Sequence, residues 1–342
     1  MNNKHKKYFG IRDIARIAGV STATVSRVIN QPDSTSNEIR EKVEAIIKEY
    51  NYVPNQMAKN LFSQDSNSIA IFIYDVSNPF FANLIKELNN IAFENVCALI
   101  ICDTENSKEK EIQYLRYCQS IRCNKIILTE GVNYDLYKDL NATQTIACLD
   151  RCSDHRFSTV TSDNYNGIKK LVDYLYNLNH RKIAFAGAMK AYHTANVRKQ
   201  SYMDTLESHD LEVREDLVFF SDRFSYETGV KALDYFWSLN DRPTAIVCAN
   251  DQIAQGLIMR AYKLKISIPD DLSIVGFDGI DNQYFYPKIT TIRQDIRKIA
   301  ETLFKAVSVT QEPLVHETIT TEFIIGESCK MIELKSDATV LR

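Results

Sequence analysis

The stretch GVSTATVSRVIN, residues 19–30, decides how the N-terminal part of this chain folds. Gly19 and Val20 turn the chain after a short helical segment over residues 11–18, and Ser21 is a suitable N-cap for a second helix that runs to about Ile29. The hydroxyl side chains in the stretch favour helix ends and hydrogen bonds over helix interiors. The stretch therefore predicts a helix, a tight turn and a second helix that carries Arg27.

A third helix follows the break at Pro32 and Asp33. Ser36 is placed to cap it, and its apolar stripe consists of Ile39, Val43, Ile46 and Ile47. Pro54 prevents this helix from continuing, and residues 57–62 can form one further short helix. The polar linker SQDSNS, residues 63–68, ends this N-terminal head.

Charge separates the head from the rest of the 342-residue chain. Residues 1–61 carry ten Lys or Arg and six Asp or Glu, a net charge of +4, whereas the whole chain has a formal net charge of −3 and the remainder therefore −7. A basic head on an acidic body predicts that the head binds a polyanion.

Several protein classes do not fit this composition. The start MNNKHKKYFGIRD lacks an apolar region after its basic residues, and no apolar run approaches the length of a membrane span, so we expect a cytoplasmic protein without a secretory signal or membrane partner. Most of the eight cysteines lie in apolar strand-like runs, which favours buried free thiols over disulfides.

Signatures of metal binding and catalysis are also missing. The candidate metal ligands are the pairs Cys118–Cys123 and Cys148–Cys152, with His155 nearby, and neither pair has the C-x2-C spacing of a zinc site. The sequence contains no G-x-S-x-G, P-loop or H-E-x-x-H motif. We therefore expect no metal, no cofactor and no enzymatic activity.

In a helix-turn-helix the second helix enters the DNA major groove with its N-terminal residues over base edges. We expect base contacts from Thr22, Ala23 and Arg27, because the Ala23 methyl suits a thymine methyl and the Arg27 guanidinium suits guanine O6 and N7. Phosphate contacts, which position a protein without specifying sequence, are expected from Ser21, Thr24, Ser26 and Asn30. The competing interpretation, a capped helical hairpin in an ordinary domain, is disfavoured by the basic charge of the head.

From Ile69 onward, apolar runs of strand length alternate with amphipathic segments. Near-continuous apolar strands separated by helices predict parallel sheets covered on both faces. The span 69–330 is too long for one small sheet, so we expect an α/β body of two doubly wound lobes that divide near residues 163–166. The expected strands are IAIFIY, ALIICD, KIILTE, TIACLD, KIAFAG, LVFFS, TAIVCAN and LSIVGFD.

The whole chain resembles the LacI/GalR family of bacterial repressors. The head carries the resemblance without a gap, in IRDIARIAGVSTATVSRVIN and SNEIREKVEAIIKEYNYVPNQMAKNL. The body carries it in VSNPFFANLI, SDNYNG, ANDQIAQG, IPDDLSIVGFDG and ITTIRQ. The resemblance implies a homodimeric repressor that binds operator DNA, with lobes like those of periplasmic sugar-binding proteins.

The resemblance also implies a hinge helix from Asn55 to about Phe62 that folds on operator DNA. Leu61 would insert into the minor groove, which agrees with the general use of an apolar wedge to kink a duplex. Lys59 departs from the family's usual arginine, so the charge is kept and planar hydrogen bonding is lost. The expected DNA contacts of this helix are Asn55, Ala58, Lys59 and Leu61.

The expected domain limits follow from the same comparison. They are a head with hinge over 1–62, a linker over 63–68, an N-lobe over about 69–163 and 294–322, a C-lobe over about 164–293 and 323–330, and a tail over 331–342. The tail lacks leucine heptads, so we expect a dimer and no coiled-coil tetramer. The apolar helix NPFFANLIKELNNIAF is a candidate dimer surface.

Polar and aromatic residues follow the strands of the body, where ligands bind in open α/β sheets. Aromatic rings can cover the C–H faces of a sugar, while carboxylates, amides and arginines bond its hydroxyls. Each residue alone has an ordinary interpretation: the phenylalanines as core, Asp150 and Arg151 as an exposed ion pair, Asn250 as a helix cap. The expected ligand contacts are Asn78, Phe80, Phe81, Asp150, Arg151, Arg198, Phe224, Asn250, Asp278 and Gln294.

This set resembles the pocket of ribose-binding proteins and ribose repressors, with N-x-F-F, a D-R pair, a later Arg, a Phe, then Asn, Asp and Gln. Sucrose-type repressors share D-R and F-D-G, and galactose-type relatives match less well. Two Asp balance two Arg, which suits an uncharged sugar better than a phosphorylated one. We therefore expect a sugar-responsive repressor with ribose as first choice of inducer. The alternatives are a sucrose-type repressor, a catabolite regulator with a phosphoprotein co-repressor, an α/β enzyme and a sugar-transport component.

Overall fold

The structure is a computed structural model, and it describes residues 9–53, 66–129, 134–137, 144–150, 157–188, 190, 192–280, 284–308 and 313–333. The chain divides into two compact units, Met1–Ser66 and Asn67–Arg342, which contain the head and the body, respectively. In the described part of the chain, no helix combines the length and the apolar character that crossing a membrane requires.

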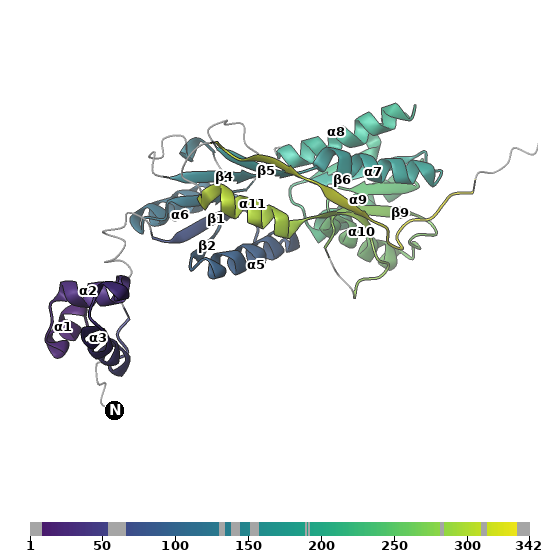
Figure 1. The fold of residues 1–342 in the computed structure, drawn as a ribbon. Coiled ribbons are helices and arrows are strands. Elements are labelled where there is room, and N and C mark those ends of the chain that lie inside the picture. Colours follow the sequence, from purple (N-terminus) through teal and green to yellow (C-terminus); the bar gives the residue numbers. More distant parts are fainter. Residues whose placement is uncertain are drawn as a thin grey trace, which may run out of the picture. The chain divides into compact units, whose positions relative to one another are not determined.

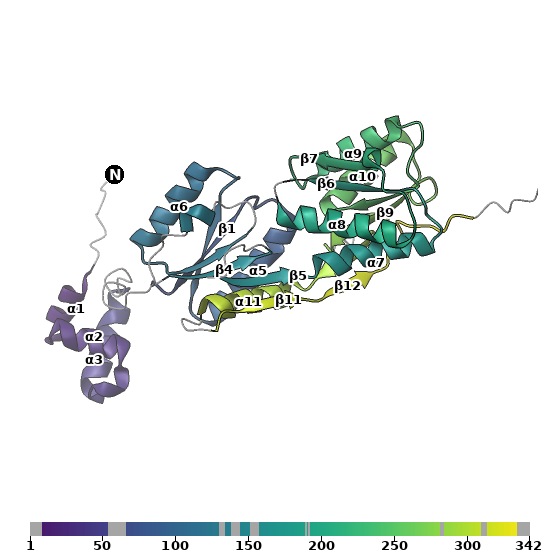
Figure 2. The same cartoon turned by 90° about the horizontal axis from the view of Figure 1, so that it is seen from above.

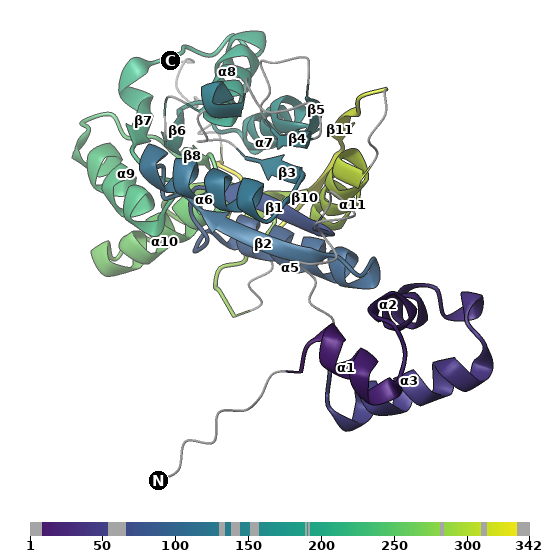
Figure 3. The same ribbon diagram turned by 90° about the vertical axis from the view of Figure 1, so that its left-hand side faces the viewer.

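Three short helices build the head around a small apolar core (Figure 3). Gly19 ends the first of them with a φ of 67°, a left-handed conformation that glycine adopts without steric cost. Ser36 stands at the N-cap position of the third helix, but its side chain makes no cap hydrogen bond, contrary to the sequence interpretation; its carbonyl accepts the Arg40 N–H at 3.0 Å instead. The helices are α1 (Ile11–Ala18), α2 (Thr22–Asn30) and α3 (Asn37–Glu49), with a 3-10 turn at Pro32–Ser34.

The packing of α1, α2 and α3 follows the apolar stripes of the sequence. Ile14 and Ala18 of α1, Val25 and Val28 of α2, and Val43 of α3 are buried together in one cluster. Since these residues recur at helical spacing, the opposite face of α2 is left to its hydroxyl side chains and Arg27.

The first sheet of the body has the strand order β11-β5-β4-β3-β1-β2, and all of its pairs are parallel. We call this sheet and its helices the N-lobe. Helices α5 and α11 pack together on one face of it (Figure 2). Its elements are β1 (Ser68–Ile73), α5 (Pro79–Glu94), β2 (Ala98–Asp103), α6 (Lys108–Ser120), β3 (Lys125–Leu128), β4 (Thr145–Leu149), β5 (Ser158–Ser162), α11 (Ile296–Ser308) and β11 (His316–Ile319), with a 3-10 turn at Tyr134–Tyr137.

The second sheet has the order β12-β10-β9-β8-β6-β7 and defines the C-lobe (Figure 1). Helices α7 and α8 pack against each other, as do α9 and α10. Its elements are α7 (Asn164–Asn177), β6 (Ile183–Ala188), α8 (His193–Ser208), β7 (Val218–Ser221), α9 (Tyr226–Ser238), β8 (Ala245–Cys248), α10 (Asp251–Leu264), β9 (Ser273–Asp278), β10 (Thr290–Gln294) and β12 (Thr321–Ile324), with a 3-10 turn at Glu215–Leu217.

The expected fold class, a helical head with two doubly wound lobes, is confirmed. One strand differs from the expectation of parallel sheets, because β12 pairs antiparallel with β10. Strands β5, β11 and β12 were not expected from the sequence, because STVTS, HETI and TEFI each contain a single aliphatic residue and lack the apolar run of a buried strand.

The chain crosses between the lobes three times, from β5 to α7, from β10 to α11 and from β11 to β12. In Figure 2, β11 and β12 follow one another along both lobes. Each lobe is therefore assembled from distant parts of the chain.

Candidate functional site

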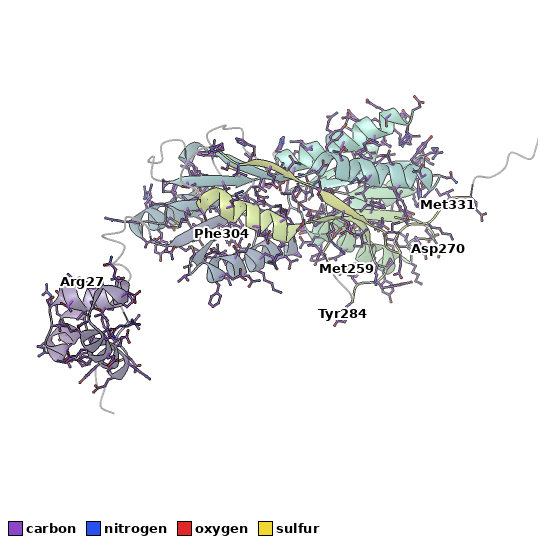
Figure 4. The ribbon with its side chains drawn as sticks, viewed as in Figure 1. Arg27, Met259, Asp270, Tyr284, Phe304 and Met331 are labelled. Atoms are coloured by element: carbon purple, nitrogen blue, oxygen red, sulfur yellow. The ribbon has the colours of Figure 1, made fainter. Side chains whose placement is uncertain are left out.

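The outer face of α2 is polar and accessible. Thr22, Ala23 and Arg27 are all exposed, and Arg27 is labelled in Figure 4. Among the described residues, the Arg27 guanidinium has no hydrogen-bond or ion-pair partner. The small side chains beside the exposed Arg27 would let the helix lie close to the bases and phosphates of a DNA groove.

The other polar residues of α2 are hydrogen-bonded within the helix. The Ser21 hydroxyl accepts the Thr24 N–H at 3.0 Å, as the sequence predicted for an N-cap, and contacts the Thr24 hydroxyl at 2.8 Å. Asn30 donates to the Ser26 carbonyl at 2.8 Å and to its hydroxyl at 3.3 Å. These bonds preorganise the helix end, and contact of the same groups with phosphate stays a prediction. The hinge residues Asn55, Ala58, Lys59 and Leu61 lie outside the described residues.

In the body, one cavity lies between the lobes at the carboxyl ends of the strands. Every expected ligand residue that the structure describes lines it, and Arg151 lies outside the described residues. Four further lining residues were missed: Tyr74, Thr129, Leu149 and Thr194. Tyr74, Thr129 and Leu149 stand at or directly after strand ends, so the same rule could have identified them. The lining residues from the expected set are Asn78, Phe80, Phe81, Asp150, Arg198, Phe224, Asn250, Asp278 and Gln294.

Arg198 occupies the centre of the polar network in this cavity. Only 5% of this residue is exposed. Its Nε donates to Asn164 Oδ1 at 2.8 Å, and its Nη1 donates to the Ala249 carbonyl at 2.6 Å. Nη1 also lies 3.8 Å from Asp278 Oδ1, and the guanidinium covers the Phe277 ring at 3.8 Å from the centroid. A buried guanidinium held from four directions is positioned without a bound molecule.

The two described carboxylates of the cavity stand on different lobes, Asp150 after β4 and Asp278 at the end of β9. Asp150 Oδ1 accepts from the Thr161 hydroxyl at 3.1 Å and from Asn164 Nδ2 at 3.3 Å. Asp278 Oδ1 accepts from Gln294 Nε2 at 2.8 Å, and the Gln294 side-chain oxygen accepts from the Ser162 hydroxyl. The network therefore joins strands β5, β9 and β10, where the chain crosses between the lobes.

Both carboxylates also stand on unusual backbone. Asp150 has a φ of 65° and Asp278 a φ of 120°, a range in which residues other than glycine are strained. Such strain persists only where the surrounding structure holds it, and it concentrates at ligand sites. Both residues line the cavity, so the strained positions coincide with the candidate site.

Burial shapes the charge state of this site. Burial raises the pKa of Asp278 to about 7, against the opposing effect of the Arg198 guanidinium. Burial also raises the pKa of Asp150, again opposed first by Arg198. With the buried Asp278 and the half-buried Asp150 around one described guanidinium, the cavity is better suited to hydroxyl donors than to an additional anion.

The two asparagines of the cavity also cap helices. Asn78 Oδ1 accepts the Phe80 N–H at 3.0 Å, and Asn250 Oδ1 accepts the Ile253 N–H at 2.9 Å. The capping interpretation and the lining interpretation are thus both correct, because a helix that starts at a strand end places its N-cap at the cavity. Each capping oxygen fixes its amide group, so that the amide nitrogen is available to a ligand.

Two family models match the chain. The model described as bacterial regulatory proteins of the lacI family matches residues 10–55. The model for a periplasmic binding protein-like domain matches residues 172–329. These matches cover α1, α2 and α3 in the head and most of the C-lobe in the body.

Similar proteins include repressors of closely comparable length. The HTH-type transcriptional repressor PurR of Vibrio vulnificus is 30% identical over 301 residues, covering 86% of this chain and 90% of the relative. The HTH-type transcriptional repressor PurR of Photobacterium profundum is 29% identical over 334 residues, covering 94% of this chain and 98% of the relative.

Solved structures share the fold. The lac repressor dimer bound to operator and the anti-inducer ONPF matches with a TM-score of 0.84 at 23% identity, covering 95% of this chain and 100% of that chain. The complex of the transcriptional regulator CelR with cellobiose matches with a TM-score of 0.69 at 23% identity, covering 94% and 99% of the two chains.

Proposed function

Because the chain belongs to the lacI family of bacterial regulatory proteins, which are DNA-binding transcription regulators and not enzymes, we propose that it is a repressor released from its operator by a free sugar. Ribose is the first choice of effector. One observation supports the sugar assignment. The expected ligand contacts were chosen one by one from their places in the sequence, and those that the structure describes line one cavity between the lobes.

The chemistry of the cavity supports an uncharged sugar. Phe81 and Phe224 provide aromatic surface from opposite lobes, and both are buried. Asp278 and Arg198 offer an acceptor and a donor that are already oriented by protein bonds. A sugar hydroxyl both donates and accepts, so paired acceptors and donors around an aromatic wall match a small polyol ring.

The head supports the DNA part of the proposal. The exposed face of α2 would enter the major groove, with Arg27 on a guanine and with Thr22 and Ala23 beside it. Dimerisation would present two heads to a near-palindromic operator. The lac repressor structure, a dimer bound to operator, supports this assembly.

The expected dimer surface on α5 requires a correction. Phe80, Phe81, Leu84 and Leu88 are buried in the core of their own lobe, because these positions form the inward stripe of the helix. Phe93, which is 82% exposed, is a large apolar residue of α5 that is accessible to a partner. We propose a cytoplasmic homodimer, and light scattering that showed a stable tetramer in dilute solution would contradict it.

Release would follow from closure of the lobes on the sugar. Closure would shift the N-lobes of the dimer against each other and separate the hinge segments that contact the operator. A ligand shifts such an equilibrium only when it binds one state more tightly than the other, so the sugar must favour the closed state.

Calorimetry with free ribose, sucrose, galactose and ribose 5-phosphate tests the effector, and electrophoretic mobility shift with a selected operator tests its consequence. We expect ribose to bind most tightly and to weaken operator binding. Tighter binding of sucrose would contradict the ribose assignment and support the sucrose-type alternative. Sugar binding without any change in operator affinity would contradict induction.

A further inference from the structure

A second hollow lies next to the cavity. Asp75, Asp103, Glu105, Asn106 and Arg223 contribute to its lining, and we call it the vestibule. Two residues, Tyr74 and Phe224, line both the cavity and the vestibule. These two aromatic side chains come from different lobes, so the wall between the hollows is itself divided between the lobes.

Tyr192 joins the two halves of this wall. Its ring meets Tyr74 edge to face with the centroids 5.2 Å apart, and it packs against Phe224 at 6.4 Å. Its hydroxyl donates a hydrogen bond to Asn106 Oδ1 at 2.6 Å. Tyr192 belongs to the buried cluster of the C-lobe and Asn106 to the loop after β2 in the N-lobe, so this bond crosses between the lobes.

The acceptor loop is shaped to hold this bond. Glu105 and Asn106 both have positive φ angles, 48° and 60°, which non-glycine residues rarely adopt. The loop is anchored by the Thr104 N–H, which donates to the Ile73 carbonyl at 2.8 Å, and by the Ser107 N–H, which donates to the Thr104 carbonyl at 2.7 Å. Its strained backbone thus places an exposed asparagine against a tyrosine that is only 6% exposed.

We propose that Tyr192 is a gate residue, whose hydrogen bond to Asn106 closes the cavity over the effector and restricts the effector to the size of a monosaccharide. The inference rests on the proposed function, in which the cavity binds a sugar. A second sugar unit that extended past Tyr74 and Phe224 into the vestibule would meet the Asn106 side chain there and would compete with the Tyr192–Asn106 bond.

The first test removes the hydroxyl and keeps the ring. Tyr192→Phe should weaken ribose binding about fivefold, the net value of one hydrogen bond, mainly through faster dissociation. Asn106→Ala should have a similar effect, and the double variant should be no weaker than either single variant, because all three lack the same bond. Tyr165→Phe is the matched control: its hydroxyl donates to Asp204 at 2.7 Å within the C-lobe, and its loss should leave ribose affinity unchanged.

Hydrogen exchange of the ligand-free protein gives a readout that needs no sugar. Residues 104–107 should exchange several-fold faster in Tyr192→Phe than in wild type or Tyr165→Phe, because the strained loop loses its cross-lobe bond. An unchanged exchange rate of residues 104–107 in Tyr192→Phe would contradict the proposed role of Tyr192. Additive losses of ribose affinity in the double variant would contradict it as well. If wild type binds no sugar while Tyr192→Phe still accelerates exchange, the sugar assignment fails and the interlobe bond is supported.

The size limit has its own test. Tyr192→Ala opens the wall, so its affinity for ribose should fall at least tenfold while its affinity for sucrose relative to ribose rises at least tenfold. Circular dichroism checks that this variant is folded, and the exposed Asn106→Ala variant provides a second route to the open wall. An unchanged ratio in both variants, or a wild-type preference for sucrose, would contradict the size limit.

Discussion

The polar side chains on α2 and those that line the cavity differ in where their hydrogen-bond partners lie in the sequence. On α2, Ser21 bonds to Thr24 and Asn30 bonds to Ser26, so each partner lies within one helical turn. In the cavity, Arg198 bonds to Asn164 and Ala249, which are 34 and 51 positions away in the chain. The helix face is determined by local sequence and the cavity by topology, so a change in one should leave the other intact.

The strongest test of this separation is Arg198→Ala. The change removes the cation beside Asp278 and the donors to Asn164 Oδ1 and to the Ala249 carbonyl, and breaking a buried charged pair costs about 3–5 kcal/mol. We expect sugar affinity to fall at least a hundredfold while operator affinity stays at the wild-type value, which would give permanent repression. Calorimetry and mobility shift measure the two affinities.

Arg181→Ala is a matched control for Arg198. Arg181 also donates to a carbonyl, that of Tyr176 at 2.9 Å, and also covers an aromatic ring at 3.9 Å, but it is exposed and does not line the cavity. We expect normal sugar affinity from this variant. A response to sugar in Arg198→Ala that equals wild type would show that the effector does not bind in this cavity.

The reciprocal change on the head is Arg27→Ala. Loss of a bidentate contact with guanine should weaken operator binding by about 1–3 kcal/mol without affecting sugar affinity. Arg40→Ala removes one positive charge from the same head, where Arg40 pairs with Glu44 at 3.0 Å, and should have a smaller effect. Equal operator affinities of Arg27→Ala and wild type would remove Arg27 from the interface.

The pH dependence of stability separates the two regions further. Burial, and then the neighbouring Asp278, raise the pKa of Asp251 to about 8. Between about pH 4, where an unfolded aspartate ionises, and pH 8, the folded chain keeps a proton that the unfolded chain has released. The stability of the body should therefore fall as pH rises through this window, by up to about 1.4 kcal/mol per pH unit for one proton.

Asp251→Asn should make this dependence shallower in urea unfolding between pH 5 and 8, and the raised pKa of Asp278 should account for part of the slope that remains. Asp270→Asn should leave it unchanged, because the surface contact of Asp270 with Lys330 lowers the pKa of Asp270, so that it ionises below this window in both states. If the free energy of unfolding changes with pH equally in Asp251→Asn and in wild type, Asp251 is not the source of the pH dependence.

The smallest effect concerns the cap of α2. Ser21→Ala removes the bond to the Thr24 N–H and should destabilise the head by about 0.5–1 kcal/mol, measured by thermal unfolding. Ser21→Asp should keep the cap, and its charge should still weaken operator binding by repelling phosphate. If Ser21→Asp binds operator as well as wild type, Ser21 does not contact phosphate.

Local sequence was sufficient to predict helices α1, α2 and α3 of the head and most strands of the body. The helix limits around Gly19 and Ser21 follow from turn and capping chemistry within a few residues, and the runs IAIFIY and TAIVCAN are apolar enough to be recognised as buried strands. The strand STVTS was not identified, because its partners β4 and β11 bury a mostly polar sequence that has no apolar run.

The sequence by itself also predicted most of the described residues that line the cavity, since strand ends can be recognised from the pattern, but it did not determine what those residues contact. Only the tertiary structure joined Ser162 to Gln294 and Gln294 to Asp278, and it added Tyr192 and Asn106 as a pair across the lobes. The reason is physical: a capping bond is decided within one turn of helix, whereas these bonds join residues far apart in the chain that meet only after two sheets have been assembled from separate segments.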